Sequence, residues 1–157
     1  MITLRRTTLA DVPTLFACEQ DARVNALAGT KPRSWADFSA RWTEILADAT
    51  GAATRVTPRV ILLDNAVVGA VNISPQDGHD AIGYVVAPEH WGKGIATQAV
   101  RLLIGEFTSR PLFATAAADN LPSLRVLQKN GFVELSRGWS AETPRCLARH
   151  TVRLVLR

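Results

Sequence analysis

Residues 82–107 read IGYVVAPEHWGKGIATQAVRLLIGEF, and this stretch decides the fold. It begins with an apolar run of good strand formers, which Pro88 ends because proline has no N–H to donate to a sheet. The small-residue loop Trp91–Gly94 follows. From Ile95 onward, apolar side chains recur at i, i+4, i+7 and i+8, the spacing of one helix face. The stretch therefore predicts a strand, a glycine loop and a helix in direct succession.

The start of this helix is a predicted anion site. The first-turn N–H groups of a helix have no intrahelical partner, and the helix dipole favours negative charge there. No Asp or Glu occupies residues 91–98, so no acidic side chain already neutralises that end. Two familiar phosphate loops are excluded: the nucleotide P-loop pattern is absent, and the dinucleotide fingerprint needs a Gly or Ala where Thr97 stands. We therefore expect a phosphate group in a different type of loop.

The composition is that of one globular domain spanning residues 1–157, with 47% apolar and 20% charged residues. Cys18 and Cys146 have neither metal-ligand spacing nor a disulfide framework. No signal peptide follows Met1, and no apolar run is long enough to span a membrane. We expect a cytoplasmic protein without a metal site or a membrane partner. The net charge of +4 comes from scattered basic residues, which disfavours a nucleic-acid partner.

The rest of the chain alternates strand and helix patterns. Strands are predicted over residues 2–7, 60–63, 67–73, 79–87, 111–117, 132–135 and 151–156. Helices are predicted to start near residues 9–11, after Ser34, after Gly94 and after Asn120. The span 21–33 has the pattern of a partly irregular connection, and 138–149 is the least predictable segment.

The order β-α-α-β-β-β-α-β-α-β-β indicates an α/β sandwich. We expect a mixed sheet of about six or seven strands with helices on both faces. The crossover through the long helix after Gly94 forces two neighbouring strands to be parallel.

The loop resembles the acetyl-CoA loop of the GCN5-related N-acetyltransferase (GNAT) family, [R/Q]-x-x-G-x-[G/A], at residues 91–96. Trp91 departs from the first position, but W-G-K-G followed by A-T is typical of the branch of ribosomal-protein N-terminal (RimJ/RimL-type) acetyltransferases. Residues 120–132, NLPSLRVLQKNGF, resemble the N-x-x-S…K-x-G-F block of that branch, and residues 2–11 are also similar to its start. The resemblance spans nearly the whole chain and implies the GNAT fold, with acetyl-CoA as cosubstrate.

The resemblance also implies which residues hold acetyl-CoA. Backbone N–H groups of the loop would bind the pyrophosphate, and backbone groups on a strand that splays from its parallel neighbour would bind the pantetheine arm and the thioester. The implied cofactor-binding residues are Val85, Val86, Trp91, Gly92, Lys93, Gly94, Ile95, Ala96, Thr97, Asn120 and Ser123. The competing interpretations are an ordinary strand-to-helix turn for the loop, a solvent-facing Lys93, and simple N-terminal capping for Asn120 and Ser123.

Two catalytic roles follow from the same resemblance. Many relatives protonate the leaving thiolate with a tyrosine, but none occurs after Tyr84, so Ser123 is the implied acid. Relatives often carry a Glu base where Ala81 stands. Asp80 is the alternative that we name as catalytic, although a turn-flanking Asp is a simpler interpretation. His79, Glu19, Asp21, Glu44 and a water chain remain further alternatives for the base.

We predict an acetyltransferase that moves the acetyl group from acetyl-CoA to a primary amine by direct attack in a ternary complex. The alternative is a non-catalytic acyl-CoA-binding module, which the missing Glu at Ala81 favours. The acceptor is a peptide or small-molecule amine, and the protein is a monomer or a homodimer. The acceptor pocket is expected in residues 21–42 and 138–149. Its candidate lining residues, which are equally candidates for packing or surface positions, are Arg33, Trp35, Trp139 and Arg145.

Overall fold

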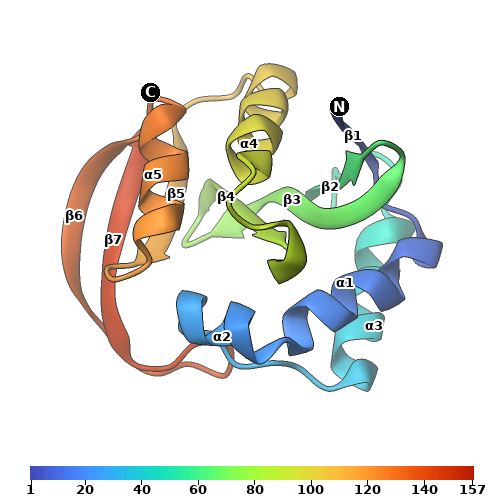
Figure 1. Ribbon diagram of the computed structural model, residues 1–157, viewed down its shortest axis with the longest axis horizontal. Coiled ribbons are helices and arrows are strands. Elements are labelled where there is room, and N and C mark those ends of the chain that lie inside the picture. Colours follow the sequence, from blue (N-terminus) through green and yellow to red (C-terminus); the bar gives the residue numbers. More distant parts are fainter.

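Seven strands form a single mixed sheet in the order β1-β2-β3-β4-β5-β7-β6 (Figure 1). The computed structural model describes residues 1–157. The strands are β1 (Ile2–Arg6), β2 (Thr57–Leu63), β3 (Ala66–Gln76), β4 (His79–Val86), β5 (Leu112–Ala117), β6 (Val133–Ser140) and β7 (Arg149–Leu156). The helices are α1 (Val12–Gln20), α2 (Ala22–Ala28), α3 (Trp35–Ala47), α4 (Ile95–Glu106) and α5 (Leu121–Lys129), with short 3₁₀ helices η1 (Leu9–Asp11) and η2 (Pro88–His90). The predicted α/β fold with a mixed sheet is confirmed.

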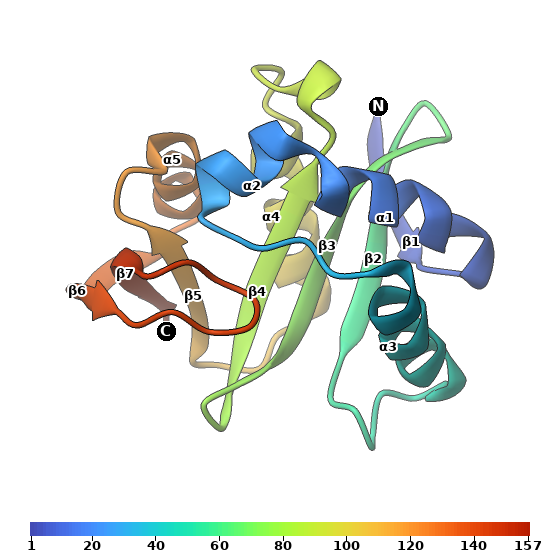
Figure 2. The same ribbon diagram turned by 90° about the horizontal axis from the view of Figure 1, so that it is seen from below.

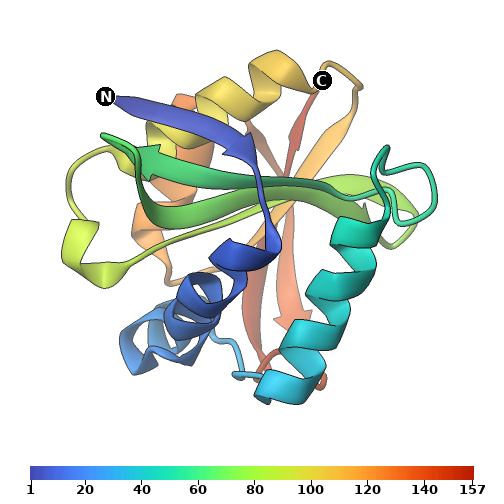
Figure 3. The same cartoon turned by 90° about the vertical axis from the view of Figure 1, so that its right-hand side faces the viewer.

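Helices cover both faces of the sheet, as expected for a sandwich. The yellow α4 lies above the sheet and the blue α1 and cyan α3 lie below it (Figure 3). The larger core, of 18 buried residues, joins α4 and α5 to the strands. A smaller core of 9 residues joins α1 and α3 to β2 and β3 on the opposite face. Alternation along β4 divides its side chains between the faces: Ile82 and Val86 enter the larger core, while Val85 packs against the smaller one.

The parallel pair β4–β5 opens along its length. β4 pairs with β3 over its whole length, from Gln76↔His79 to Gly69↔Val86. Its register with β5 contains only one pair, Ala81↔Phe113. Beyond Ala81 the two strands diverge, so the predicted parallel neighbours and the predicted splay are both confirmed. The polar backbone edge of β4 that faces β5 is therefore left without a partner strand near Val86.

The structure corrects the predicted connection over residues 21–33, because α2 occupies part of it. Asp21 caps this helix by accepting a hydrogen bond from the Arg23 N–H at 2.8 Å. Gly29 ends it in the left-handed region, with φ of 69°. The start signal at Asp21 and the stop signal at Gly29 were both present in the sequence. Val24, Leu27 and Ala28 fall at i, i+3 and i+4 and line the cavity described below, but none of the seven helical residues is buried. A helix of seven residues repeats this spacing too few times to give a clear periodic signal.

Several strands are longer than their apolar patterns. The strand predicted at 132–135 continues in the structure to Ser140, and the one predicted at 151–156 begins earlier, at Arg149. These two strands pair with each other as far as Ser140 and Arg149. β6 is an edge strand whose side chains are almost all exposed. Polar exposed side chains give no alternating pattern, so only the pairing with β7 reveals these extensions.

Asp11 organises the turn between β1 and α1. Its carboxylate accepts hydrogen bonds from Arg5 Nη1 at 2.7 Å and from the Thr8 N–H at 2.8 Å. The Arg5 hydrogen bond is the main cause that holds the pKa of Asp11 below its ordinary value, with further lowering from Thr8 against the opposing effect of burial. The pair fixes the first strand to the helix that follows.

None of the helices is both long and apolar enough to cross a membrane.

Candidate active site

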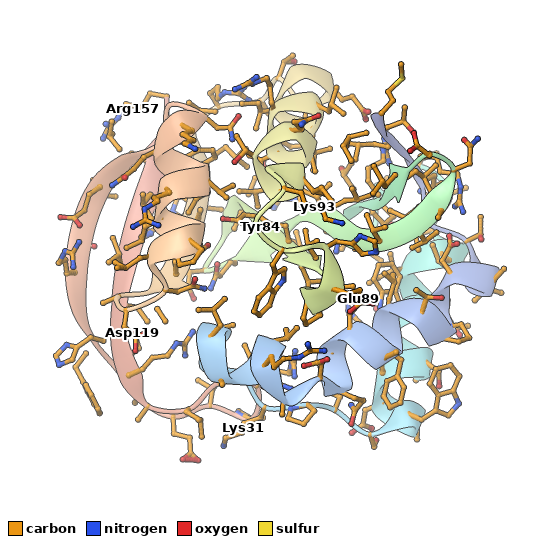
Figure 4. The ribbon with its side chains drawn as sticks, in the orientation of Figure 1. Lys31, Tyr84, Glu89, Lys93, Asp119 and Arg157 are labelled. Atoms are coloured by element: carbon orange, nitrogen blue, oxygen red, sulfur yellow. The ribbon has the colours of Figure 1, made fainter.

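A cavity of about 490 Å³ lies where α2, the end of β4 and the N-termini of α4 and α5 meet. It collects the predicted cofactor-binding residues with one exception. Those that line it are Val85, Val86, Trp91, Gly92, Gly94, Ile95, Ala96, Thr97, Asn120 and Ser123. The exception, Lys93, is exposed on the loop and does not line the cavity. Figure 4 shows Tyr84 at the centre of the view, between α5 and the loop that carries Lys93.

The α4 N-terminus is open to the cavity. Gly92 and Gly94 adopt left-handed conformations, with φ of 78° and 74°, and a Cβ on either would meet no heavy atom within 4 Å. Gly94 is the N-cap, and no side chain caps this helix, whereas Ser34 and Asn120 cap α3 and α5. Uncapped N–H groups at the positive end of a helix dipole form a site for an anion such as a phosphate.

The backbone N–H and C=O groups of Val85 and Val86 point to opposite sides of β4. The Ala87 N–H donates to the Val68 carbonyl at 2.9 Å, so alternation directs the polar groups of Val85 toward β3 and those of Val86 toward the open gap. The backbone of Val85 is therefore used within the sheet. This corrects the expectation that Val85 backbone groups bind the pantetheine arm; only its side chain lines the cavity.

Trp91 fastens the loop to the end of β4. Its indole Nε1 donates to the Val86 carbonyl at 2.7 Å. The carbonyl that faces the gap is thus already bonded, and the Val86 N–H remains as the free backbone donor. This hydrogen bond explains in physical terms why a tryptophan suits the first position of the loop: it orients the glycines against the strand.

Ser123 and Tyr84 form a hydrogen-bonded pair across the cavity. Their hydroxyl oxygens lie 2.7 Å apart, and the Ser123 carbonyl, 3.1 Å from Tyr84 Oη, is a second acceptor for the one phenolic proton. Burial raises the pKa of Tyr84 to about 12, against the opposing effect of the Ser123 hydrogen bond. Tyr84 is therefore a neutral donor at physiological pH. Sequence reasoning missed it, because a tyrosine was sought only after residue 84, although alternation already placed its side chain on the α5 face.

Asn120 caps α5, so the capping interpretation is correct for this residue. Its Oδ1 accepts a hydrogen bond from the Ser123 N–H at 3.2 Å. Asn120 is buried and lines the cavity, and its Nδ2 donates to no protein group. The same side chain can therefore hold the helix start with its oxygen and offer its amide hydrogens to a bound molecule.

Three further cationic or titratable side chains line the cavity, and sequence reasoning did not single them out: His90, Arg125 and Lys129. Arg125 and Lys129 are exposed, form no ion pair, and lie four residues apart on one face of α5. That spacing was the available signal. Unpaired cations beside the open α4 N-terminus add to its preference for an anion.

The structure does not bring Asp80 to this cavity. Its carboxylate pairs with Arg55 at 3.4 Å at the start of β4, and it lines neither this cavity nor the second one described below. His79 stacks on Phe113, with ring centroids 4.9 Å apart. Both residues therefore have packing or pairing partners of their own, and the catalytic expectation for Asp80 has no geometric support.

The remaining candidate bases are also engaged elsewhere. Glu19 is partly buried and pairs with Arg33 and Arg145, at 2.6 and 2.8 Å. Asp21 caps α2, and Glu44 pairs with Arg41 on the surface of α3. No cluster of three or more His, Cys, Asp or Glu side chains could hold a metal ion.

A second cavity, of about 350 Å³, lies over β4, β5, β7 and the end of β6. Its lining residues include Trp139. They also include Ala81 on β4, Phe113 and Thr115 on β5, and Arg153 on β7. These strand residues alternate with those of the larger core, so the cavity lies on the sheet face opposite α4 and α5.

The two segments expected to form the acceptor pocket come together. The Lys31 N–H donates to the Arg145 carbonyl at 2.8 Å, and Thr30 and Cys146 form a β-bridge. Figure 2 shows the β6–β7 loop beside the connection from α2 to α3. Of the four named candidates only Trp139 lines the second cavity. Arg33 and Arg145 pair with Glu19, and Trp35 packs edge-to-face against Phe16.

Comparisons with known proteins agree with this geometry. A model of the acetyltransferase (GNAT) domain matches residues 1–133. The chain is 30% identical over 139 residues to an uncharacterized N-acetyltransferase, p20, of Bacillus licheniformis, covering 83% of this chain and 78% of that protein. The Vibrio cholerae spermidine N-acetyltransferase, solved in complex with CoA and spermine, has a TM-score of 0.82 at 15% identity, over 99% of this chain and 94% of that one. Mycobacterium smegmatis RimJ, in complex with CoA-disulfide, has a TM-score of 0.75 at 25% identity, over 99% and 81%. The chain therefore belongs to the GNAT family of acetyltransferases, as the glycine loop and the Asn120–Phe132 block indicated.

Proposed function

We propose that the protein transfers the acetyl group of acetyl-CoA to a primary amine in a ternary complex. The observation that carries this proposal is the open α4 N-terminus, with its uncapped N–H groups at Gly92–Ala96, in the same cavity as the Ser123–Tyr84 pair. The first feature suits the pyrophosphate of the cosubstrate and the second suits a leaving thiolate. Family membership and the CoA bound to similar proteins support the same choice.

The chain's own groups would divide the reaction between them. The Val86 N–H donates to the acetyl carbonyl oxygen, which stabilises the negative charge that develops there. The amine nitrogen forms a bond to the carbonyl carbon, and the carbon–sulfur bond breaks. Ser123 Oγ gives its proton to the sulfur and regains one from water. Meanwhile the one phenolic proton of Tyr84 is donated to Ser123 Oγ in place of the Ser123 carbonyl, which stabilises the serine as it loses its proton.

No carboxylate or imidazole of the predicted set lies where the attacking amine would lose its proton. Ala81 occupies the position at which relatives often carry Glu, and Asp80 is paired with Arg55. We infer that the amine binds after losing one proton to solvent and that water carries the second proton away. The rate should then rise with pH until the free amine is deprotonated.

The test is CoA release, followed with a thiol reagent, from acetyl-CoA and a panel of primary amines. Turnover with at least one amine is expected, and Ser123→Ala should lower kcat about a hundredfold with acetyl-CoA affinity nearly unchanged. Asp80→Asn is the matched control and should leave kcat unchanged. Tight acetyl-CoA binding without turnover on any amine would favour the second candidate, a non-catalytic acyl-CoA-binding module, for which the missing carboxylate at Ala81 is the supporting observation.

A further inference from the structure

The 350 Å³ cavity contains one arginine, Arg153, that no protein carboxylate pairs with. Its charged lining residues are Asp77, Arg137 and Arg153. Arg137 pairs with Glu134 at 2.6 Å. Arg153 forms no ion pair and no side-chain hydrogen bond; its guanidinium carbon lies 4.4 Å from the centre of the Phe113 ring. A guanidinium stacked on an aromatic ring keeps its in-plane N–H donors free, and a planar fork of donors suits a carboxylate or a phosphate.

An open strip of β4 joins this cavity to the proposed acetyl-transfer site. Ala81 lines the 350 Å³ cavity, Val85 lines the 490 Å³ cavity, and Gly83 lies between them on the same face of the strand. A Cβ built on Gly83 would meet no heavy atom within 4 Å, so the strip is uncovered there. At about 3.3 Å per residue, the four steps from Ala81 to Val85 span about 13 Å.

We propose that the 350 Å³ cavity binds the far end of the acceptor, and that the acceptor is an elongated primary amine with an anionic group about 10–13 Å from its nitrogen. Arg153 binds that anion, and the small side chains along β4 leave room for the chain that connects it to the amine. The proposal rests on the proposed acetyl transfer and names its substrate class. A polyamine of the same length would place a cation beside Arg153, and like charges repel.

The test compares acceptors that differ only in the charge of the far end. An extended tetrapeptide spans about 13 Å, so tetraglycine and tetraglycinamide form one pair. Aminohexyl phosphate and diaminohexane form a second pair, which separates a phosphate from a carboxylate as the preferred anion. We expect kcat/KM to be about tenfold or more higher for the anionic member of at least one pair, the ratio typical of hydrogen bonds to a charged group.

Variants of Arg153 assign that preference to the cavity. Arg153→Gln should remove the preference, and Arg153→Lys, which keeps the charge but loses the planar fork of donors, should retain part of it. Arg101→Gln, at an exposed and unpaired arginine on α4, is the matched control and should leave the preference unchanged.

The experiment distinguishes failure of the anionic-acceptor inference from failure of the proposed acetyl transfer. Equal kcat/KM for the anionic and non-anionic members of both pairs, or a preference that survives Arg153→Gln, would overturn the anionic-acceptor inference while CoA release still supports acetyl transfer. Absence of CoA release with every amine, despite acetyl-CoA binding, would instead overturn the proposed function.

Discussion

The glycine at the start of α4 offers a sharp test of the cofactor site, because a second glycine provides its control. Gly94 has φ of 74° and a Cβ there would meet no protein atom within 4 Å. Gly78, in the turn between β3 and β4, has φ of 78° and equally open surroundings. Alanine at either position must adopt the left-handed conformation, which costs about 1 kcal/mol after the gain from a less flexible unfolded chain. Both variants should therefore lose the same stability.

Only Gly94→Ala should weaken acetyl-CoA binding, since Gly78 does not line the cavity. The added methyl group holds the phosphates away from the uncapped N–H groups, and one lost hydrogen bond to a charged group is about 1.5–3 kcal/mol. Kd should then rise at least about tenfold. At a ligand concentration of about 100 times the unsubstituted Kd, the stabilisation by acetyl-CoA should fall from about 2.7 to about 1.4 kcal/mol.

Thermal denaturation with and without acetyl-CoA measures both quantities. Without ligand, the two variants should melt about 2–4 °C below the unsubstituted protein. With ligand, Gly78→Ala should recover the full shift and Gly94→Ala about half of it. If Gly94→Ala binds acetyl-CoA as tightly as Gly78→Ala does, the phosphate site at the α4 N-terminus is wrongly assigned.

Three further substitutions test single contacts. Tyr84→Phe should lower kcat about tenfold without changing acetyl-CoA affinity. Because the folded pKa of Tyr84, about 12, lies above the unfolded value, this tyrosine adds stability that is lost as pH rises from about 10 to 12. Urea titrations of the variant should lack that loss. Asp11→Asn should cost about 1–3 kcal/mol at pH 7, since the lowered pKa beside Arg5 adds stability above the unfolded pKa and loses it as pH falls; a variant equally destabilised at pH 2 would contradict this. Trp91→Phe removes the indole hydrogen bond to Val86, and calorimetry should show several-fold weaker acetyl-CoA binding with about 1 kcal/mol lower stability.

Local patterns predicted most of the fold because they were strong where the chain is buried. The apolar run before Pro88, the glycine loop and the helical stripe that starts at Ile95 each correspond to an observed element. The patterns failed where the structure is exposed: α2 buries none of its residues, and β6 is an edge strand. Such segments owe their conformation to caps and pairing, which hydrophobic periodicity does not report.

The candidate site divides in the same way. The glycine loop is contiguous in sequence, so the resemblance of residues 91–96 reached every residue of that loop that lines the cavity. The residues expected to take part in catalysis are far apart in the sequence, and Asp80 was predicted to be catalytic although it lies outside the cavity. Alternation placed Asp80 on a face of β4, but no sequence rule could pair it with Arg55, which lies before β2.

The sequence by itself determined the α/β class, the parallel strand pair and the glycine loop with its uncapped N–H groups at the α4 N-terminus. These follow from spacing along the chain, since a glycine loop between a strand and a helix must present N–H groups wherever it is placed. Only the tertiary structure decided which groups meet across the sheet: Tyr84 with Ser123, and Arg153 with Phe113. Contacts between residues about forty apart depend on how helices pack and strands splay, and those depend on the whole core.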